Sequence, residues 1–331
     1  MRRINLDFKF RDLVELSSHY KSYFKYAITK KPPNFPLVFH IQTINTCNGS
    51  CTMCPYSKKK PERVERISNE LFEKIINEIV QHSKSSRYTY IHMYLQNEPI
   101  LDKDIFRKLR YIKDKSKENV ITGLTTNGTL LTPDKIPDLI SSDLDELVVS
   151  LDAFTKETYS KIRKGLDFDK VNENLEALIK SDYKNSIFVE FTKQKENAKE
   201  LNDFIEYWKK KGLPILLFNI SNRGGEVENF DEYRMKAGKT VLLFRLKRFI
   251  LKRMIRCCPL VLTTFNIRSN GDVIICCNDY TENLILGNIN KNSIKEIWNS
   301  EKYKNIRKYL HDKELNKLPI CKSCSIFKDN F

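Results

Sequence analysis

Apolar strand-like runs alternate with amphipathic helical stretches along most of the chain. The strand-like runs cover residues 37–44, 88–95, 120–125, 147–151, 187–191 and 215–220. Apolar residues at helical spacing predict helices over residues 71–81, 103–115, 156–180 and 198–211, and a further helix that opens at Thr132-Pro133. Six such alternations predict parallel strands with right-handed crossovers, and hence an α/β layer that curves toward a barrel.

The pattern changes on both sides of this layer. Residues 1–34 carry apolar side chains at helical spacing and predict a packing helix. Residues 257–331 hold two strand-like runs that meet at Asn270-Gly271, a strong hairpin signal, followed by a helical stretch over residues 294–310. We therefore predict four segments: a helical extension (1–34), the α/β layer (35–231), a linker (232–256) and a small C-terminal domain (257–331).

The linker is strongly basic. It interleaves Lys and Arg with apolar residues and has no acidic residue after Glu232. Such a helix could cover the barrel, dock an acidic substrate or electron donor, or make peripheral contact with an anionic membrane. The net charge of the whole chain, +16, likewise predicts attraction to acidic partners without choosing among them.

Length and composition set the remaining bounds. A chain of 331 residues can form one large α/β domain and a smaller one. No apolar run approaches the roughly 18 residues of a membrane span, and the N-terminus lacks the apolar core of a signal peptide. We therefore expect a cytoplasmic protein, in which nine cysteines indicate metal or redox chemistry rather than disulfides.

Three of these cysteines follow the first predicted strand. Cys47, Cys51 and Cys54 have C-x3-C-x2-C spacing in a loop that also contains Asn48 and Gly49. Zinc is disfavoured because no second C-x2-C or H-x3-H follows nearby, and buried structural cysteines are disfavoured by the loop composition. A [4Fe–4S] cluster held by three thiolates keeps one iron open to another ligand.

This cysteine loop resembles the signature of the radical S-adenosylmethionine (SAM) superfamily. There the open iron binds the amino and carboxylate groups of SAM, and reductive cleavage releases a 5′-deoxyadenosyl radical. The resemblance implies an open, six-unit (β/α)6 partial barrel with its chemistry at the C-terminal ends of the strands.

Polar motifs at those strand ends extend the resemblance. Glu98-Pro99 matches the end of a Gly-Gly-Glu-Pro-like motif in which Gln96 and Asn97 replace both glycines. Asn127 lies in a T-N-G stretch. Ser150 and Asp152 form an S-x-D motif, and Arg163 lies in a Y-x3-R-x-G-like stretch. The candidate cofactor-binding residues are Met53, Gln96, Asn97, Glu98, Asn127, Ser150, Asp152 and Arg163.

A second cysteine set lies in the C-terminal segment. It combines C-x12-G-x4-C with a terminal C-x2-C, and the residues alone suit structural zinc as well as an iron-sulfur cluster. The segment resembles the SPASM/Twitch extension of radical SAM enzymes, which implies one auxiliary [4Fe–4S] cluster on Cys258, Cys276, Cys321 and Cys324. Cys257 and Cys277 are then spare, and a spare thiol could donate a hydrogen atom, as in some radical epimerases.

The stretch S-N-R-G-G at residues 221–225 suggests a substrate contact. It resembles aminocyclitol-oxidising radical SAM dehydrogenases, and the rigid donor fork of Arg223 suits hydroxyl, carboxylate or phosphate groups, although a solvated turn arginine is the alternative. We expect hydrogen-atom abstraction from a sugar, cyclitol or nucleotide-sugar, with the auxiliary cluster taking up the remaining electron. The alternative is a maturase or epimerase of a ribosomally made peptide.

The expected protein partner is an acidic electron donor such as flavodoxin or ferredoxin. No nucleic-acid partner is expected. The non-enzymatic alternative, a basic zinc protein, predicts zinc without labile sulfide and strongly salt-dependent nucleic-acid binding.

Overall fold

A computed structural model describes most of the chain. It covers residues 31–83, 89–116, 120–183, 187–235, 257–280 and 284–326, together with residues 26, 28 and 29. Most of the predicted N-terminal helix and the basic segment 236–256 therefore lie outside the described residues. Within the described residues, no helix has the length and apolar character needed to cross a membrane.

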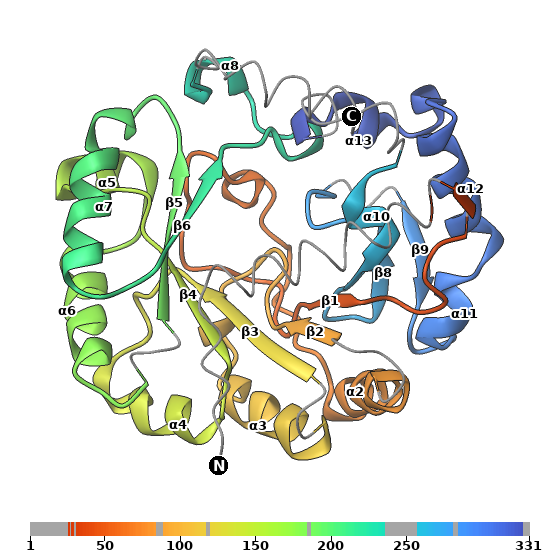
Figure 1. The fold of residues 1–331 in the computed structure, drawn as a ribbon, viewed down its shortest axis with the longest axis horizontal. Coiled ribbons are helices and arrows are strands. Elements are labelled where there is room, and N and C mark those ends of the chain that lie inside the picture. The colour runs from red at the N-terminus through yellow and green to blue at the C-terminus, as the bar shows by residue number, and fades with distance from the viewer. Residues whose placement is uncertain are drawn as a thin grey trace.

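Six parallel strands form the first part of a curved sheet (Figure 1). They are β1 (Val38–Ile41), β2 (Thr89–His92), β3 (Val120–Thr126), β4 (Glu146–Ser150), β5 (Ile187–Lys193) and β6 (Ile215–Asn219). Each pairs in parallel with the next strand along the chain. The predicted six-unit α/β layer is confirmed, since every predicted strand is present within a few residues of its expected bounds.

Helices surround the outer face of these strands (Figure 1). They are α2 (Asn69–Ser83), α3 (Ile105–Ser116), α4 (Ile136–Ser141), α5 (Lys156–Ile162), α6 (Phe168–Ile179) and α7 (Leu201–Lys210). Alternate strand residues pack against them; Phe191 of β5 lies against Phe204 of α7, with ring centroids 4.7 Å apart. The helix expected at Thr132-Pro133 begins with the 3-10 turn η3 (Pro133–Lys135), and Thr132 makes no side-chain capping bond there.

The C-terminal region continues the same sheet. Its elements are α10 (Pro259–Thr263), β7 (Thr264–Ile267), β8 (Asp272–Ile274), β9 (Ile285–Asn288), α11 (Ile294–Trp298), α12 (Glu301–His311) and α13 (Pro319–Ser323). The predicted hairpin is confirmed, because β7 and β8 are antiparallel and Gly271 has a φ of 88° between them. The sequence did not predict that β7 pairs in parallel with β1, which joins both regions in one nine-stranded sheet.

The prediction of one continuous helix over residues 294–310 was wrong. The chain forms two helices because Ser300 starts a new one, its hydroxyl accepting a hydrogen bond from the backbone N–H of Tyr303 at 3.3 Å. Ser293 and Glu296 form a capping box at the start of α11.

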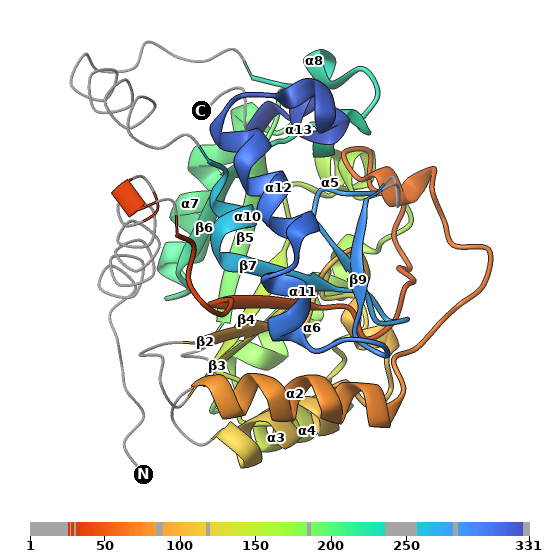
Figure 2. The same ribbon diagram turned by 90° about the vertical axis from the view of Figure 1, so that its right-hand side faces the viewer.

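Short elements follow β6 and lead toward the C-terminal region. The 3-10 turn η6 (Arg223–Gly225) is followed by α8 (Phe230–Tyr233), and Figure 2 shows α8 and α13 at the same end of the molecule. The remaining 3-10 turns are η1 (Pro55–Ser57), η2 (Pro99–Leu101), η5 (Ala198–Glu200) and η7 (Leu315–Lys317).

Polar side chains fill the inner face of the sheet below the strand ends. His40 Nδ1 lies 3.0 Å from Asn266 Oδ1, and His92 Nε2 lies 2.9 Å from Thr125 Oγ1. Burial lowers the pKa of His40 to about 4 and that of His92 to about 3, so both rings are neutral at physiological pH. The two histidines of this polar layer therefore add no charge beneath the end of the sheet where the motifs gather.

Gly123 of β3 makes room for Tyr90 in this layer. A Cβ at residue 123 would lie 2.8 Å from Tyr90 Cζ and closer still to its hydroxyl oxygen, which donates a hydrogen bond to Glu146. Gly123→Ala should therefore lower the free energy of unfolding by about 1–3 kcal/mol, measured by denaturant titration. With Tyr90→Ala already present, the same substitution should cost much less; equal costs in both backgrounds would contradict the packing argument.

Candidate functional site

The cysteine loop at the end of β1 is fixed by three neighbouring segments. The backbone N–H of Glu98 donates to Thr46 O at 2.9 Å, and that of Ser50 donates to Lys164 O at 2.7 Å. Asn127 Nδ2 donates to Asn48 Oδ1 at 2.7 Å. The structure thus brings the motifs after β2, after β3 and after α5 into contact with one loop, although up to about 115 residues separate them in the sequence.

The three thiols of this loop have different surroundings. Cys47 Sγ accepts a hydrogen bond from the Gly49 N–H at 3.4 Å, and burial raises its pKa to about 12. Burial also raises the pKa of Cys51, against the lowering effect of the neighbouring Arg163 guanidinium. Cys54 Sγ lies 3.7 Å from the hydroxyl oxygen of Tyr280, which belongs to the C-terminal region. Met53 is buried with Ile162 and Ile220.

Among the described residues, no three His, Cys, Asp or Glu side chains converge closely enough to share one metal ion. The thiolates of a cubane cluster each bind a different iron and need no such convergence. The assignment of individual cysteines as ligands stays a prediction.

Glu98 and Asn97 follow β2 on the inner side of the cysteine loop. The Glu98 carboxylate accepts hydrogen bonds from Thr126 Oγ1 at 2.7 Å and from the N–H groups of Asn127 at 2.8 Å and Ile100 at 3.1 Å. The buried Asn97 Nδ2 has no hydrogen-bond partner among the described residues. Asn97 therefore offers an unused donor beside the loop, while Glu98 is already committed to the β3 turn.

Gln96 contacts the C-terminal region instead. Its Nε2 donates to Asp279 O at 2.8 Å and to Cys277 O at 3.2 Å, and its Oε1 accepts from Arg268 Nη2 at 3.4 Å. The side-chain amide thus holds the loop after β8 against the end of β2. Its expected role in cofactor binding stays a prediction, whereas this positioning role was not visible in the sequence.

A buried ion pair connects the end of β4 with the end of α5. Asp152 Oδ2 lies 2.5 Å from Arg163 Nη2, and Asp152 Oδ1 accepts from the Thr192 N–H at 2.6 Å. Burial lowers the pKa of Arg163, but Asp152 and Cys51 raise it, and the net shift is upward. Arg163 Nε has no partner among the described residues, and Ser150 lies buried two residues before Asp152.

The four cysteines expected to hold the auxiliary cluster come from three separate elements. Cys258 precedes α10, Cys276 follows β8, and Cys321 and Cys324 lie on and just after α13. Cys258 and Cys321 each act electrostatically on Cys276. The spare Cys257 is fully buried next to Arg307, and the spare Cys277 lies next to Arg223. The choice of Cys258 over Cys257 as a ligand stays a prediction.

The S-N-R-G-G turn docks the terminal C-x2-C segment. Asn222 Nδ2 donates to Ser323 O at 2.7 Å, and Asn222 Oδ1 accepts from the Ser325 N–H at 2.8 Å. A Cβ on Gly224 would lie 2.5 Å from Ile320 Cγ1, and one on Gly225 would lie 2.9 Å from Ser323 Cβ. Asn222 and both glycines thus pack this turn closely against the terminal C-x2-C segment.

Arg223 lies in this turn, close enough to both cysteine sets to interact electrostatically with Cys54 and Cys277. Its Nη1 donates to Asn278 Oδ1 at 3.1 Å, and its charge acts on Tyr94, Tyr280, Cys277 and Glu190. We call the region formed by the side chains of Tyr94, Glu190, Arg223, Cys277 and Tyr280 the inner chamber. No sequence motif pointed to Tyr94, Glu190 or Tyr280 as members of this site. An acidic residue inside the apolar run 187–191 was the available signal for Glu190.

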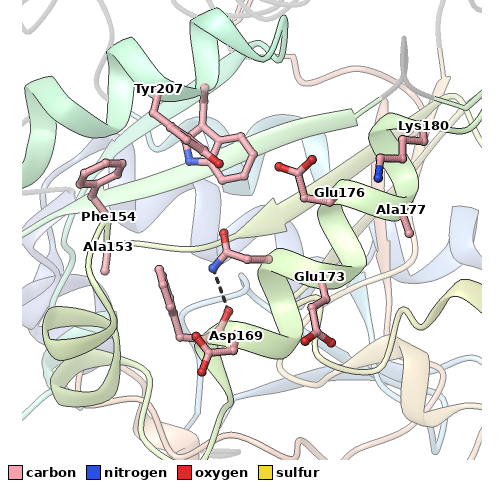
Figure 3. Close-up of a pocket in the computed structure, with 11 residues that line it drawn as sticks. Ala153, Phe154, Asp169, Glu173, Glu176, Ala177, Lys180 and Tyr207 are labelled. Carbon is pink, nitrogen blue, oxygen red and sulfur yellow. Dashed lines mark hydrogen bonds between the residues drawn. The ribbon is translucent and has the colours of Figure 1, made fainter.

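A pocket of about 810 Å³ lies elsewhere, between α6 and α7. Figure 3 shows Phe154 and Tyr207 on one side of it and Asp169, Glu173 and Glu176 of α6 on the other. These acidic residues pair with Lys156, Lys170 and Lys211. This pocket contains none of the cysteines, and we assign the chemistry to the inner chamber.

Comparison with known proteins defines the class of this protein. The radical SAM superfamily profile matches residues 41–218, and that of the SPASM iron-sulfur cluster-binding domain matches residues 257–325. The chain belongs to the radical SAM superfamily and carries a SPASM domain. It therefore uses SAM and [4Fe–4S] clusters, one that binds SAM and an auxiliary one.

Individual relatives are distant but cover most of the chain. The S-adenosyl-L-methionine-dependent 2-deoxy-scyllo-inosamine dehydrogenase of Niallia circulans is 20% identical over 290 residues, 87% of this chain and 92% of the relative. The crystal structure of BtrN in complex with AdoMet and 2-DOIA has a TM-score of 0.60 at 17% identity and covers 87% of this chain and 92% of that one. Streptococcus suis SuiB, bound to precursor peptide SuiA, has a TM-score of 0.62 at 15% identity, with 98% and 76% covered.

The residues around the cysteine loop fit these cofactors. Three thiols stand on one loop, and two buried donors beside it, Asn97 Nδ2 and Arg163 Nε, have no partner among the described residues. The carboxylate and ribose oxygens of a ligand such as SAM could accept hydrogen bonds from these donors.

Proposed function

We propose that this enzyme oxidises a hydroxyl-bearing carbon of a sugar, cyclitol or nucleotide-sugar. The observation that carries the proposal is that the loops of both cysteine sets contribute residues to the inner chamber or contact it. Cys54 of the first set contacts Tyr280, and Tyr280 follows Cys276 of the second set by four residues. A substrate in this chamber would lie between the site that starts the reaction and a second redox group. The similarity to a 2-deoxy-scyllo-inosamine dehydrogenase over most of the chain supports this reading.

The residues of the chain have separate tasks in this proposal. Bound SAM and its cluster supply a radical that removes a hydrogen atom from a substrate carbon, and an oxidised auxiliary cluster can accept an electron. Arg223 would hold a substrate oxygen with its donor fork, fixed on one side by Asn278. Gln96 and Asn222 keep the C-terminal loops against the chamber, which limits the access of water.

The net charge of the chain and its expected cytoplasmic location suggest an electron-donating protein partner. An acidic flavodoxin or ferredoxin would be attracted by the net charge of +16 and would supply electrons in the cytoplasm. A peripheral membrane contact through residues 232–256 stays a prediction, and residues 236–256 lie outside the described residues.

A peptide substrate is the second candidate, and Cys277 favours it. Its thiol lies in the inner chamber beside Arg223, where it could return a hydrogen atom to a substrate radical. SuiB, which resembles this chain in fold, has been crystallised with its precursor peptide. Epimerisation would incorporate deuterium from D2O without net oxidation, and Cys277→Ala would stop that incorporation.

The experiment that tests the proposal is product analysis under anaerobic conditions. The protein with its clusters, SAM and a strong reductant is incubated with 2-deoxy-scyllo-inosamine, scyllo-inositol or UDP-glucose. A ketone formed together with 5′-deoxyadenosine, and deuterium moving from the substrate carbon into 5′-deoxyadenosine, would support the proposal. Turnover of a precursor peptide and of none of these alcohols would refute it.

Arg223→Ala should reduce substrate turnover by roughly 10- to 100-fold, because the chamber loses its charged hydrogen-bond donor. Formation of 5′-deoxyadenosine uncoupled from product should remain measurable by chromatography. Arg223→Lys keeps the charge but not the planar fork, and should recover only part of the turnover. Arg223→Ala with wild-type turnover would remove Arg223 as a substrate contact.

A further inference from the structure

We propose that Glu190 accepts the proton that leaves the substrate hydroxyl when its carbon is oxidised. This inference rests on the proposed function, because a proton acceptor is needed only if a hydroxyl becomes a carbonyl. Glu190 belongs to none of the motifs on which the superfamily resemblance was based.

Glu190 faces the inner side of the sheet. Its neighbours on β5, Val189 and Phe191, are fully buried, and Phe191 packs against Phe204 of α7 on the outer side. Since side chains alternate along a strand, Glu190 extends toward the opposite face. In the register of the sheet it lies beside Ser150 of β4, whose S-x-D stretch borders the same chamber.

Charged and titratable groups from four other segments act on the Glu190 carboxyl. Asp152 follows β4, Arg163 follows α5, Arg223 lies in η6, and Tyr94 follows β2. Thr192 on the same strand is the one hydrogen-bond partner that the described residues give this carboxyl, with its Oγ1 at a long 3.4 Å from Oε1. Glu190 therefore lies between the predicted SAM-binding residues and the predicted substrate contact.

The three carboxyl groups in this region differ in how fully their oxygens are used. Both oxygens of Glu98 and both of Asp152 accept short hydrogen bonds from backbone or side-chain donors. Glu190, with its single long hydrogen bond, keeps acceptor capacity for a further donor such as a hydroxyl group. Of these three, Glu190 is the group that can receive a proton without breaking a structural contact.

The protonation behaviour of Glu190 suits this task. Burial, together with the charge of Asp152, raises its pKa to about 7, while Arg163 and Arg223 act in the opposite direction. A group with a pKa near the working pH can both accept a proton and release it afterwards. Burial raises the pKa of Tyr94 far above neutrality, so Tyr94 stays protonated and cannot compete as a base.

Transfer of this proton to Glu190 accounts for the last of the three particles that the oxidation removes from the substrate. Conversion of H–C–O–H to C=O removes one hydrogen atom from carbon, one proton from oxygen and one further electron. Under the proposed function the hydrogen atom goes to the 5′-deoxyadenosyl radical, and the electron goes to the oxidised auxiliary [4Fe–4S] cluster. The O–H bond breaks as the C=O bond forms, and the proton moves to a Glu190 carboxylate oxygen and later to solvent.

The test compares Glu190→Gln with the wild type over pH 5.5 to 8.5, using the alcohol that the wild type oxidises among 2-deoxy-scyllo-inosamine, scyllo-inositol and UDP-glucose. Ketone formation by the wild type should fall up to tenfold per pH unit below about pH 7. Glu190→Gln should be slower by about 10²–10⁴-fold and should lack this pH dependence. Glu190→Asp should regain part of the rate. The exposed carboxylate Glu196 provides the control, since Glu196→Gln should keep both the rate and the pH profile.

A second readout does not depend on turnover. The infrared spectrum of the anaerobically purified protein should contain a carboxyl band that titrates near pH 7 and is missing in Glu190→Gln. Absence of that band, or a Glu190→Gln variant with the rate and pH profile of the wild type, would overturn the role of Glu190 while the proposed oxidation stands. If the wild type oxidises none of the three alcohols, the proposed function fails, and the role of Glu190 fails with it.

Discussion

Replacing Cys47, Cys51 and Cys54 together by alanine should abolish the cleavage of SAM. The loop that carries these thiols is held by the segments after β2, β3 and α5, so its shape should survive the substitution while the proposed cluster ligands are lost. Without the cluster, no electron can reach SAM. The measurement is 5′-deoxyadenosine formed by the anaerobic protein with dithionite, which should fall to the background of the assay.

Iron and sulfide analysis of the same variant shows which of the two clusters is lost. The wild type should contain about eight iron and eight sulfide ions per chain, and the triple variant about four of each, because the auxiliary cluster remains. Cys257→Ala is the matched control, since Cys257 faces Arg307 and should be dispensable for both clusters. Cleavage of SAM by the triple variant would refute the assignment of these ligands, and a wild type with about four irons would remove the auxiliary cluster.

Arg163→Met should lower the free energy of unfolding by about 3–5 kcal/mol, the largest effect expected from a single substitution in this site. The substitution leaves Asp152 buried without its cation, and Asp152 already has an unusual φ of 61°. It also removes the guanidinium next to Cys51. Denaturant titration of the anaerobic protein measures the change.

The same helix supplies the control for this prediction. Lys161 of α5 forms an exposed pair with Glu157, and Lys161→Met should change stability little because water screens that pair. If Arg163→Met were as well tolerated as Lys161→Met, the buried pair would contribute nothing to the fold. SAM binding by Arg163→Met, measured by equilibrium dialysis, would in addition test the predicted contact with the cofactor.

The strand ends show how far a linear pattern can predict a site. Short apolar runs between helical stretches located all six parallel strands, because the strands of a covered parallel sheet are buried on both faces and are therefore apolar along most of their length. The motifs at Glu98, Asn127 and Asp152 were expected at strand ends, and the structure brings their segments to the cysteine loop or the inner chamber. Their individual cofactor contacts stay predictions.

Other expectations depended on contacts that no local pattern records. The cofactor role expected for Gln96 stays a prediction, while its amide holds the carbonyl groups of Cys277 and Asp279, 181 and 183 residues away in the sequence. The S-N-R-G-G stretch was singled out for Arg223 alone, but Asn222 and its neighbouring glycines pack against the terminal C-x2-C segment. Predicting these roles requires knowing which distant segment packs against Gln96 and Asn222, and the local sequence does not contain that information.

The sequence by itself determined the α/β layer, the two cysteine sets and the membership of the radical SAM superfamily, because hydrophobic periodicity and ligand spacing are local properties of a chain. Only the tertiary structure decided that β7 joins the sheet beside β1, that Cys54 meets Tyr280, and that Glu190 lies among Asp152, Arg163 and Arg223. These contacts form when separate strand ends are packed together, and the burial that follows changes the protonation of the groups they enclose.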